Sequence, residues 1–228
     1  MTKTQSKALS RKAQGEETRS ILIQTGARLF ARNGYHGVSM RTLASEAEVN
    51  LATVSYHFGG KRGLYKAILQ DIINKRDEIY PSADETQKQL SGTEGDIHAQ
   101  AESVSWFINK LVHGLLGQEE HIWPAFIISR ELAQPSDLYP KLEREFFEPS
   151  FQSLRTLVKT VLPDGTDEEE LIITAHCIIG MVVKFLDGFS ILTKRLEWTN
   201  YEGHGIEKIA AILSKRTRGF LGLPMENA

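Results

Sequence analysis

The chain has 228 residues, of which 27 are basic, 29 are acidic and 41% are hydrophobic. A net charge near −2 argues against a wholly basic nucleic-acid binder, and the hydrophobic share argues against a disordered chain. The length suffices for one or two domains with a sizeable core. The single cysteine, Cys177, excludes an internal disulfide, and its apolar surroundings predict a small buried side chain in a reducing compartment.

Charge is distributed unevenly along the chain. Residues 1–66 carry 11 Lys/Arg and 4 Asp/Glu, whereas the remainder carries 16 and 25. A basic amino-terminal third on an acidic remainder indicates that the first part meets a polyanion. Residues 1–15 are basic and contain no apolar run, so we expect a flexible arm rather than a secretory signal, and a cytoplasmic protein.

The amino-terminal part shows helical spacing of its apolar residues. Asn33-Gly34 supplies a left-handed helix stop, Ser39 is a typical N-cap, and Pro81 ends the last helical pattern of this part. The predicted helices cover residues 18–33, 40–46, 51–58 and 61–79.

The remainder is also expected to be helical, with a loop over residues 82–95, where apolar groups are few. Thr166 and Glu169 have the spacing of a capping box. The predicted helices cover residues 96–117, 122–132, 138–162 with a bend at Pro149, 171–192 and 206–220. Strand-like alternation is absent, so the predicted class is all-α.

The apolar stretch 171–192 has three interpretations. A membrane span is disfavoured because His176, Lys184 and Asp187 interrupt it, and no membrane partner is expected. A helix that is apolar nearly all round lies either inside a large core or across a subunit interface. In a chain of this length, the interface is favoured.

Residues 39–58 have the pattern of a helix-turn-helix, in which the second helix enters the major groove of DNA. Its slim amino-terminal residues, Leu51, Ala52 and Thr53, allow a close approach to base edges. Polar side chains around them suit phosphates, and Lys61 begins the next helix, where free amides favour an anion. The predicted DNA-binding residues are Ser39, Arg41, Asn50, Leu51, Ala52, Thr53, Ser55, Tyr56, His57 and Lys61.

Residues 18–69 resemble the DNA-binding region of the TetR/AcrR family of transcriptional regulators. The resemblance is carried by Phe30, Gly34-Tyr35, Ser39-Met40-Arg41, Leu43-Ala44, Ala47, Val49, Thr53, Tyr56-His57-Phe58, Lys61 and Leu64-Tyr65. Glu48 stands at a turn position where the family usually has Gly, and Ala52 and Ser55 stand where Gly and Tyr are frequent.

The carboxy-terminal part resembles, more weakly, the effector domain of CecR-type regulators, through Ser129-Arg130-Glu131 and an apolar penultimate helix. The resemblance implies a homodimer formed by the last two long helices, a double-stranded DNA operator, and a small-molecule effector that releases it. We therefore expect three parts: a flexible basic arm over 1–15, a three-helix DNA-binding domain over 16–66, and a helical effector-binding and dimerisation domain over 67–228. An apolar effector pocket is predicted from Trp106, Phe107, Trp123, Phe126, Arg130, His176, Met181 and Lys184.

Plainer interpretations stay open for these residues. Arg41, Lys61 and Lys66 also fit a solvated surface, the aromatic residues also fit an ordinary core, and Arg130 also fits an ion pair with a glutamate. The alternative function is an effector-independent DNA-binding regulator whose helical domain only dimerises. A helical interaction protein with a vestigial motif is a further alternative. Enzyme motifs and metal-ligand spacings are absent from the sequence, so no catalysis, cofactor or metal is expected.

Overall fold

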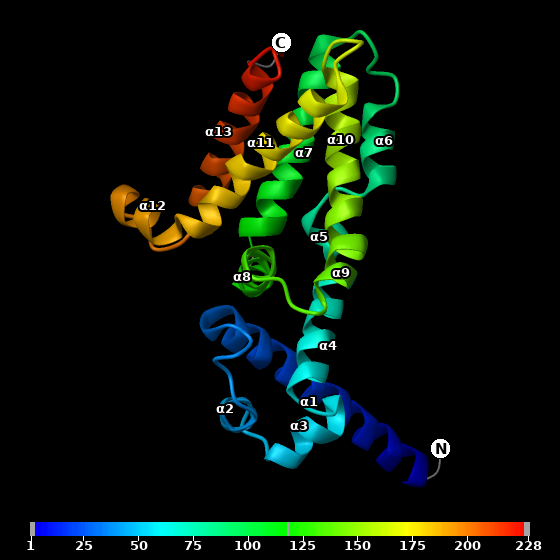
Figure 1. Cartoon of the computed structure of the whole chain (residues 1–228), viewed down its shortest axis with the longest axis vertical. Coiled ribbons are helices and arrows are strands. Elements are labelled where there is room, and N and C mark those ends of the chain that lie inside the picture. Colours follow the sequence, from blue (N-terminus) through cyan, green and yellow to red (C-terminus); the bar gives the residue numbers. More distant parts are fainter. Residues whose placement is uncertain (1–2, 118, 226–228) are drawn as a thin grey trace. The chain divides into compact units, whose positions relative to one another are not determined.

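The structure is a computed structural model that describes residues 3–117 and 119–225, with side chains from 13 to 117 and from 123 to 225. All regular elements among these residues are helices (Figure 1), which confirms the predicted all-α class. The chain forms two compact units. Unit 1 contains the described residues up to Asn74 together with Phe126–Leu138, and unit 2 contains Lys75–Ala125 and the described residues from Tyr139 onward.

Unit 1 is built on contacts of its first and fourth helices. Its helices are α1 (Lys3–Asn33), α2 (Met40–Glu46), α3 (Leu51–Phe58), α4 (Lys61–Asn74) and the end of α8 (Glu119–Ala133). Helix α1 packs against α4, and α3 packs against both α2 and α4. Gly26 permits the first of these contacts, because a Cβ there would lie 2.9 Å from Cδ1 of Ile68. The core contains Leu22, Phe30, Leu43, Val54, Leu64 and Ile68.

Helix α1 is longer than the sequence pattern predicted. The stretch predicted as an irregular arm is helical from Lys3 onward. It contains no proline, and Lys, Ala, Gln and Arg are strong helix formers, so it extends a helix whose buried part lies further along the chain. The spacing of apolar residues did not reveal this part of the helix because residues 1–15 contain no apolar run.

Unit 2 is arranged around α7, which contacts five other helices of the unit. Its longer helices are α6 (Ala83–Leu90), α7 (Ile97–Leu116), α10 (Glu148–Val161), α11 (Glu168–Asp187), α12 (Phe189–Leu196) and α13 (His204–Phe220). Short segments α5 (Arg76–Ile79), α9 (Tyr139–Leu142) and a π-helical turn (Glu143–Phe147) connect them. Helix α13 lies beside α7, and α10 lies beside α6 (Figure 1).

Two predictions between residues 61 and 95 were wrong. The helix predicted over 61–79 is interrupted at Lys75, and the separate α5 brings the backbone of Ile79 so close to Gly114 of α7 that a Cβ on the glycine would lie 2.4 Å from the Ile79 carbonyl oxygen. The predicted loop 82–95 contains α6, which begins with a complete capping box between Ser82 and Glu85. A helix of two turns needs few apolar residues, and Leu90 and Thr86 suffice to bury its inner face.

The interruption predicted near Pro149 is present, but it takes the form of the π-helical turn that precedes the proline. Pro149 then occupies the first turn of α10, where its missing N–H is tolerated. The capping box predicted at Thr166 and Glu169 is wrong, because the N-cap of α11 is the next residue. Asp167 caps α11, accepting from the amide of Glu170 at 2.9 Å, while Thr166 donates to the carbonyl of Pro163.

The apolar stretch predicted over 171–192 bends by 71° between α11 and α12. Within the described ranges no single helix has the length and hydrophobicity to cross a membrane, and only this bent pair meets the test jointly. Cys177, predicted to be buried, is exposed on α11. This face of α11 is open to solvent in the described part of the chain, as the exposure of Ile172 and Ile173 also indicates.

Candidate nucleic-acid interface

The two helices predicted as a helix-turn-helix have the predicted bounds and the predicted first cap. Ser39 accepts from the amide of Thr42 at 3.0 Å, and Asn50 accepts from the amide of Thr53 at 2.8 Å, so a side chain caps each helix. Between the helices, Glu48 has φ of 53°, in the left-handed region. Glycine is favoured there, and a larger residue costs on the order of 1 kcal/mol. The departure at Glu48 therefore leaves the turn in place at some cost in stability.

The amino-terminal end of α3 faces solvent while its inner side is anchored. Val54 is fully buried, and Leu43 and Ala44 of α2 are buried with it. Leu51 is 45% exposed, and Ala52 is also exposed. The helix is thus held from behind and presents a slim, accessible end, as groove entry requires.

Asn50 and Thr53 are bound to each other. The Thr53 hydroxyl donates to Oδ1 of Asn50 at 3.0 Å, and the same oxygen accepts from the Thr53 amide. This leaves the Thr53 hydroxyl oxygen as an acceptor and the Asn50 amide nitrogen as a donor. The pair therefore offers both kinds of hydrogen-bonding group at the end of the helix.

The predicted phosphate-binding residues differ in accessibility. Tyr56 is 86% exposed, and its ring meets His57 edge to face. Arg41, Ser39 and Ser55 are exposed. Lys61 begins α4, and its ammonium lies 4.5 Å from the centroid of the Tyr35 ring.

The contact between Lys61 and Tyr35 was not foreseen from the sequence. Partial burial lowers the pKa of Lys61 below its ordinary value, and the ring face stabilises its charged form by a cation–π contact. Arg19 of α1 makes a similar contact, with its guanidinium 5.3 Å from the Phe58 ring centroid. No local spacing signals such pairs, because their members lie far apart in the sequence.

Two family models match this chain. One, described as bacterial regulatory proteins of the tetR family, matches residues 22–68, which include both helices of the helix-turn-helix. The other, described as the C-terminal domain of the HTH-type transcriptional dual regulator CecR, matches residues 101–222, more than half of the chain. The chain belongs to the TetR/AcrR family of transcriptional regulators. It is a DNA-binding protein with a helix-turn-helix, and not an enzyme.

Relatives of this TetR-family chain span nearly its whole length. The HTH-type transcriptional dual regulator CecR of Shigella flexneri is 26% identical over 196 residues, 86% of this chain and 87% of the relative. Among solved structures, HlyIIR, a hemolysin II transcriptional regulator, has a TM-score of 0.56 at 20% identity, over 88% of this chain and 98% of its own. AibR in complex with isovaleryl coenzyme A and operator DNA has a TM-score of 0.57 at 17% identity, over 87% and 97%. At these identities the structural likenesses establish the fold.

The residues predicted to form an effector pocket in this regulator are divided between the units. Phe126 and Arg130 belong to unit 1, and the other six belong to unit 2. Trp106 and Phe107 have ring centroids 6.2 Å apart, with Phe107 fully buried, as also expected for ordinary core. The site as predicted stays a prediction.

The polar members of that set lie in other surroundings than expected. His176 and Lys184 are exposed on α11, so neither is a buried polar group in need of a partner. The guanidinium of Arg130 donates to two backbone carbonyls of α1, those of Ala31 and Arg32. A pattern of apolar spacing does not tell which polar residues of a helix face solvent.

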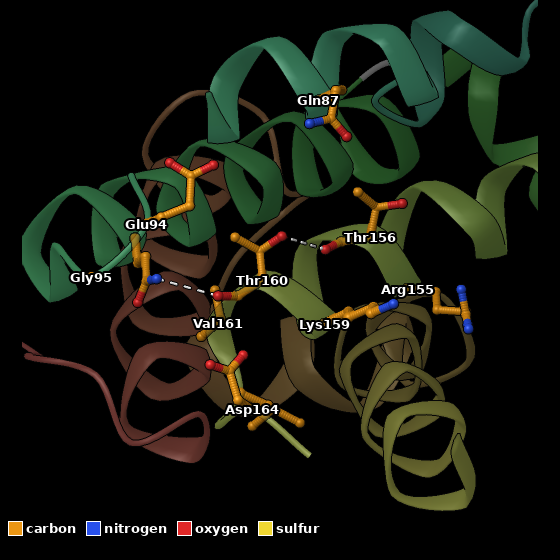
Figure 2. A pocket seen from close by; sticks show the side chains of 11 residues that line it. Gln87, Glu94, Gly95, Arg155, Thr156, Lys159, Thr160, Val161 and Asp164 are labelled. Carbon is orange, nitrogen blue, oxygen red and sulfur yellow. Dashed lines mark hydrogen bonds between the residues drawn. The ribbon is translucent and has the colours of Figure 1, made fainter. Parts of the chain in front are cut away.

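Unit 2 contains a polar cleft of about 630 Å³ that the sequence did not suggest (Figure 2). Helix α10 supplies Arg155, Thr156, Lys159 and Thr160, and Glu94 lies across from them. Arg155 is engaged by both carboxylate oxygens of Glu168 at 2.7 Å, which raises its pKa. The volume falls in the range of small-molecule sites, about 300–1,000 Å³, and the lining suits a polar ligand.

Proposed function

We propose that this regulator binds a partly palindromic operator as a homodimer, represses transcription there, and leaves the operator when a small-molecule effector binds. The observation that carries the proposal is the exposed apolar surface of α11 and α13, two helices that contact each other. Ile173 is 61% exposed, Ile212 48% and Phe220 51%. Large exposed apolar side chains on two helices in contact favour association with another surface.

A second copy of this chain is the partner that DNA recognition requires. One α3 has only eight residues and reads a few base pairs, which gives a small interface. Two such helices, held about 34–36 Å apart, contact successive turns of the major groove on one face of the duplex. A pairing of identical subunits about a twofold axis matches an inverted repeat in the operator.

An effector releases the dimer from DNA if it favours a conformation in which the distance between the two α3 helices no longer matches one turn of the duplex. A ligand that binds both conformations equally shifts nothing. The cleft of unit 2 supports the existence of a ligand site, as does AibR, whose structure holds both isovaleryl coenzyme A and operator DNA. Experiment decides whether the ligand binds in this cleft or in the effector pocket predicted from the sequence.

Selection of bound duplexes from random DNA with the purified chain tests the operator and the symmetry together. An inverted repeat with half-sites about one helical turn apart is expected, and enrichment of single half-sites would contradict the dimer. A metabolite panel then tests the effector: a true effector raises the melting temperature and lowers operator affinity together. If no ligand does both, the effector-independent alternative is correct.

Removal of the Tyr56 hydroxyl is expected to weaken binding equally on all sequences. Tyr56→Phe loses one contact to a phosphate, so affinity falls about threefold to tenfold on both the selected and a scrambled duplex. Fluorescence anisotropy over a range of salt concentrations measures this loss. Tyr139→Phe in unit 2 is the matched control, and a change confined to the selected sequence would instead make Tyr56 a base-reading residue.

Thr53→Val is expected to change base preference. The substitution keeps the shape of the side chain and removes the hydroxyl acceptor, so one or two positions of each half-site lose their preference, by about tenfold or more per site. Repeating the selection with the variant measures the effect. Thr156→Val on α10 is the control. An unchanged preference would remove Thr53 from base readout.

A further inference from the structure

The end of α8 and the loop after it, Phe126–Leu138, belong to the DNA-binding unit although they lie within the matched carboxy-terminal domain. Helix α8 begins in unit 2 and ends in unit 1 as one continuous helix. The DNA-binding unit is therefore completed by a segment from the second domain. The contacts of this segment with the other helices of unit 1 therefore bear on how those helices are held.

Arg130 binds the carboxyl end of α1. Its Nε donates to the carbonyl of Ala31 and one of its terminal nitrogens donates to the carbonyl of Arg32, each at 2.8 Å. The last carbonyls of a helix lack partners within the helix and carry partial negative charge, so a guanidinium stabilises them. Gly34 follows closely, and a Cβ there would lie 3.3 Å from a terminal nitrogen of Arg130, so a larger residue would press on the guanidinium.

Glu131 binds α4. Its side chain is 2% exposed, and Oε1 accepts from the hydroxyl of Tyr65 at 2.6 Å. Oε2 accepts from the amide and the hydroxyl of Ser136 at 3.1 and 3.0 Å. A buried carboxylate is tolerated when several donors satisfy it, and here three do. Burial, and next the hydrogen bond to Glu131, raise the pKa of Tyr65 well above its ordinary value, so Tyr65 stays a donor.

The Tyr65 ring continues this connection toward the DNA-reading surface. It lies 5.0 Å from the Tyr35 ring, centroid to centroid, and the Tyr35 ring in turn lies under the ammonium of Lys61. Phe30 of α1 meets both tyrosine rings. A packed series of side chains thus leads from Glu131 to Lys61, the first residue of α4, which follows α3 after only two glycines.

We propose that Arg130 and Glu131 are positioning residues for DNA binding: with Tyr65 they form a clasp that holds α1 and α4, and hence α3 and Lys61, in the arrangement that binds DNA. Because α8 continues into unit 2, a change in that unit that displaces α8 opens the clasp and lowers DNA affinity. That an effector causes such a change rests on the proposed function. The clasp itself rests on the contacts within unit 1. Neither residue is required to touch DNA.

The test compares Glu131→Gln, Tyr65→Phe and the double variant in the full-length dimer. Each single substitution is expected to lower affinity for the selected duplex about tenfold, and the double variant no further than the weaker-binding single variant, because both act on the same contact. Tyr201→Phe is the matched control, since it removes a buried tyrosine hydrogen bond, 2.9 Å to the Phe185 carbonyl, in unit 2. It is expected to lower the melting temperature and leave DNA affinity unchanged.

Hydrogen exchange separates positioning from mere stability. If clasp closure and DNA binding are coupled, the selected duplex slows exchange of the amides in 126–138 of the wild-type chain, and Glu131→Gln abolishes that slowing. The clasp is refuted if the wild-type chain binds its duplex while both single variants bind it equally well. It is also refuted if Tyr201→Phe weakens binding as much as they do. Failure of the wild-type chain to bind any duplex would refute the proposed function instead.

Discussion

Ile173→Lys is expected to convert the protein into a monomer and to lower operator affinity by about 100-fold or more. The side chain is 61% exposed in the single chain, so the substitution costs little in the folding of the subunit. In a dimer that buries this face, two lysines would be brought together without a partner, and an unpaired buried charge is strongly unfavourable. The DNA-binding units of two separate monomers bind independently, so the affinity gained from binding both half-sites together is lost. Sedimentation velocity and anisotropy with the selected duplex measure the two losses.

Ile97→Lys is the control for this prediction. Ile97 begins α7, is 53% exposed and does not belong to the α11 and α13 surface, so its substitution is expected to leave both assembly and affinity unchanged. Cys177, the single cysteine, lies one helical turn after Ile173 and is exposed. A thiol-specific crosslinker should therefore join two wild-type subunits and fail to join Ile173→Lys subunits. A dimeric Ile173→Lys protein would place the interface elsewhere.

The number of basic residues in the amino-terminal third overstates the positive charge that is available to bind DNA. Arg62 is engaged by Asp137, and Arg28 lies 3.6 Å from Glu46, so these two cations have partners within the unit. These contacts are at least partly exposed and contribute little to stability. They lower the positive potential around α3, so in the proposed function the attraction for phosphates comes from other cations, such as Arg41 and Lys61.

Local patterns predicted the helix-turn-helix and little else of the site. Ser39, Gly34 and Gly59 set helix ends through interactions within four residues, so α2 and α3 have the predicted bounds. The bonds of Arg130 to α1 and of Glu131 to Tyr65 join positions 98, 99 and 66 residues apart, and no spacing in one sequence reveals them. The same limit explains the unforeseen cleft of unit 2, whose walls come from separate helices.

Gly63→Ala is expected to lower the free energy of unfolding of the DNA-binding unit by about 3 kcal/mol and operator affinity by about tenfold or more. A Cβ at this position would lie 1.7 Å from the carbonyl oxygen of Phe58. Neither atom belongs to a flexible side chain, so relief requires the end of α3 to move away from α4. The same movement shifts the groove-facing residues of α3. Chemical denaturation and anisotropy measure the two effects.

Gly15→Ala is the control for this prediction, because an added Cβ there is expected to cause no loss of stability or affinity. Gly15 lies within α1, and no heavy atom is within 4 Å of where its Cβ would stand. Alanine there is expected to be neutral or to stabilise by up to about 1 kcal/mol, because it favours the helix, and to leave DNA affinity unchanged. If Gly63→Ala behaved in the same way, the contact between the end of α3 and the first turn of α4 would not determine how the recognition helix is held. The expected difference between the two variants would show that the junction at Gly63, and not the sequence of α3 alone, sets the position of the DNA-reading surface.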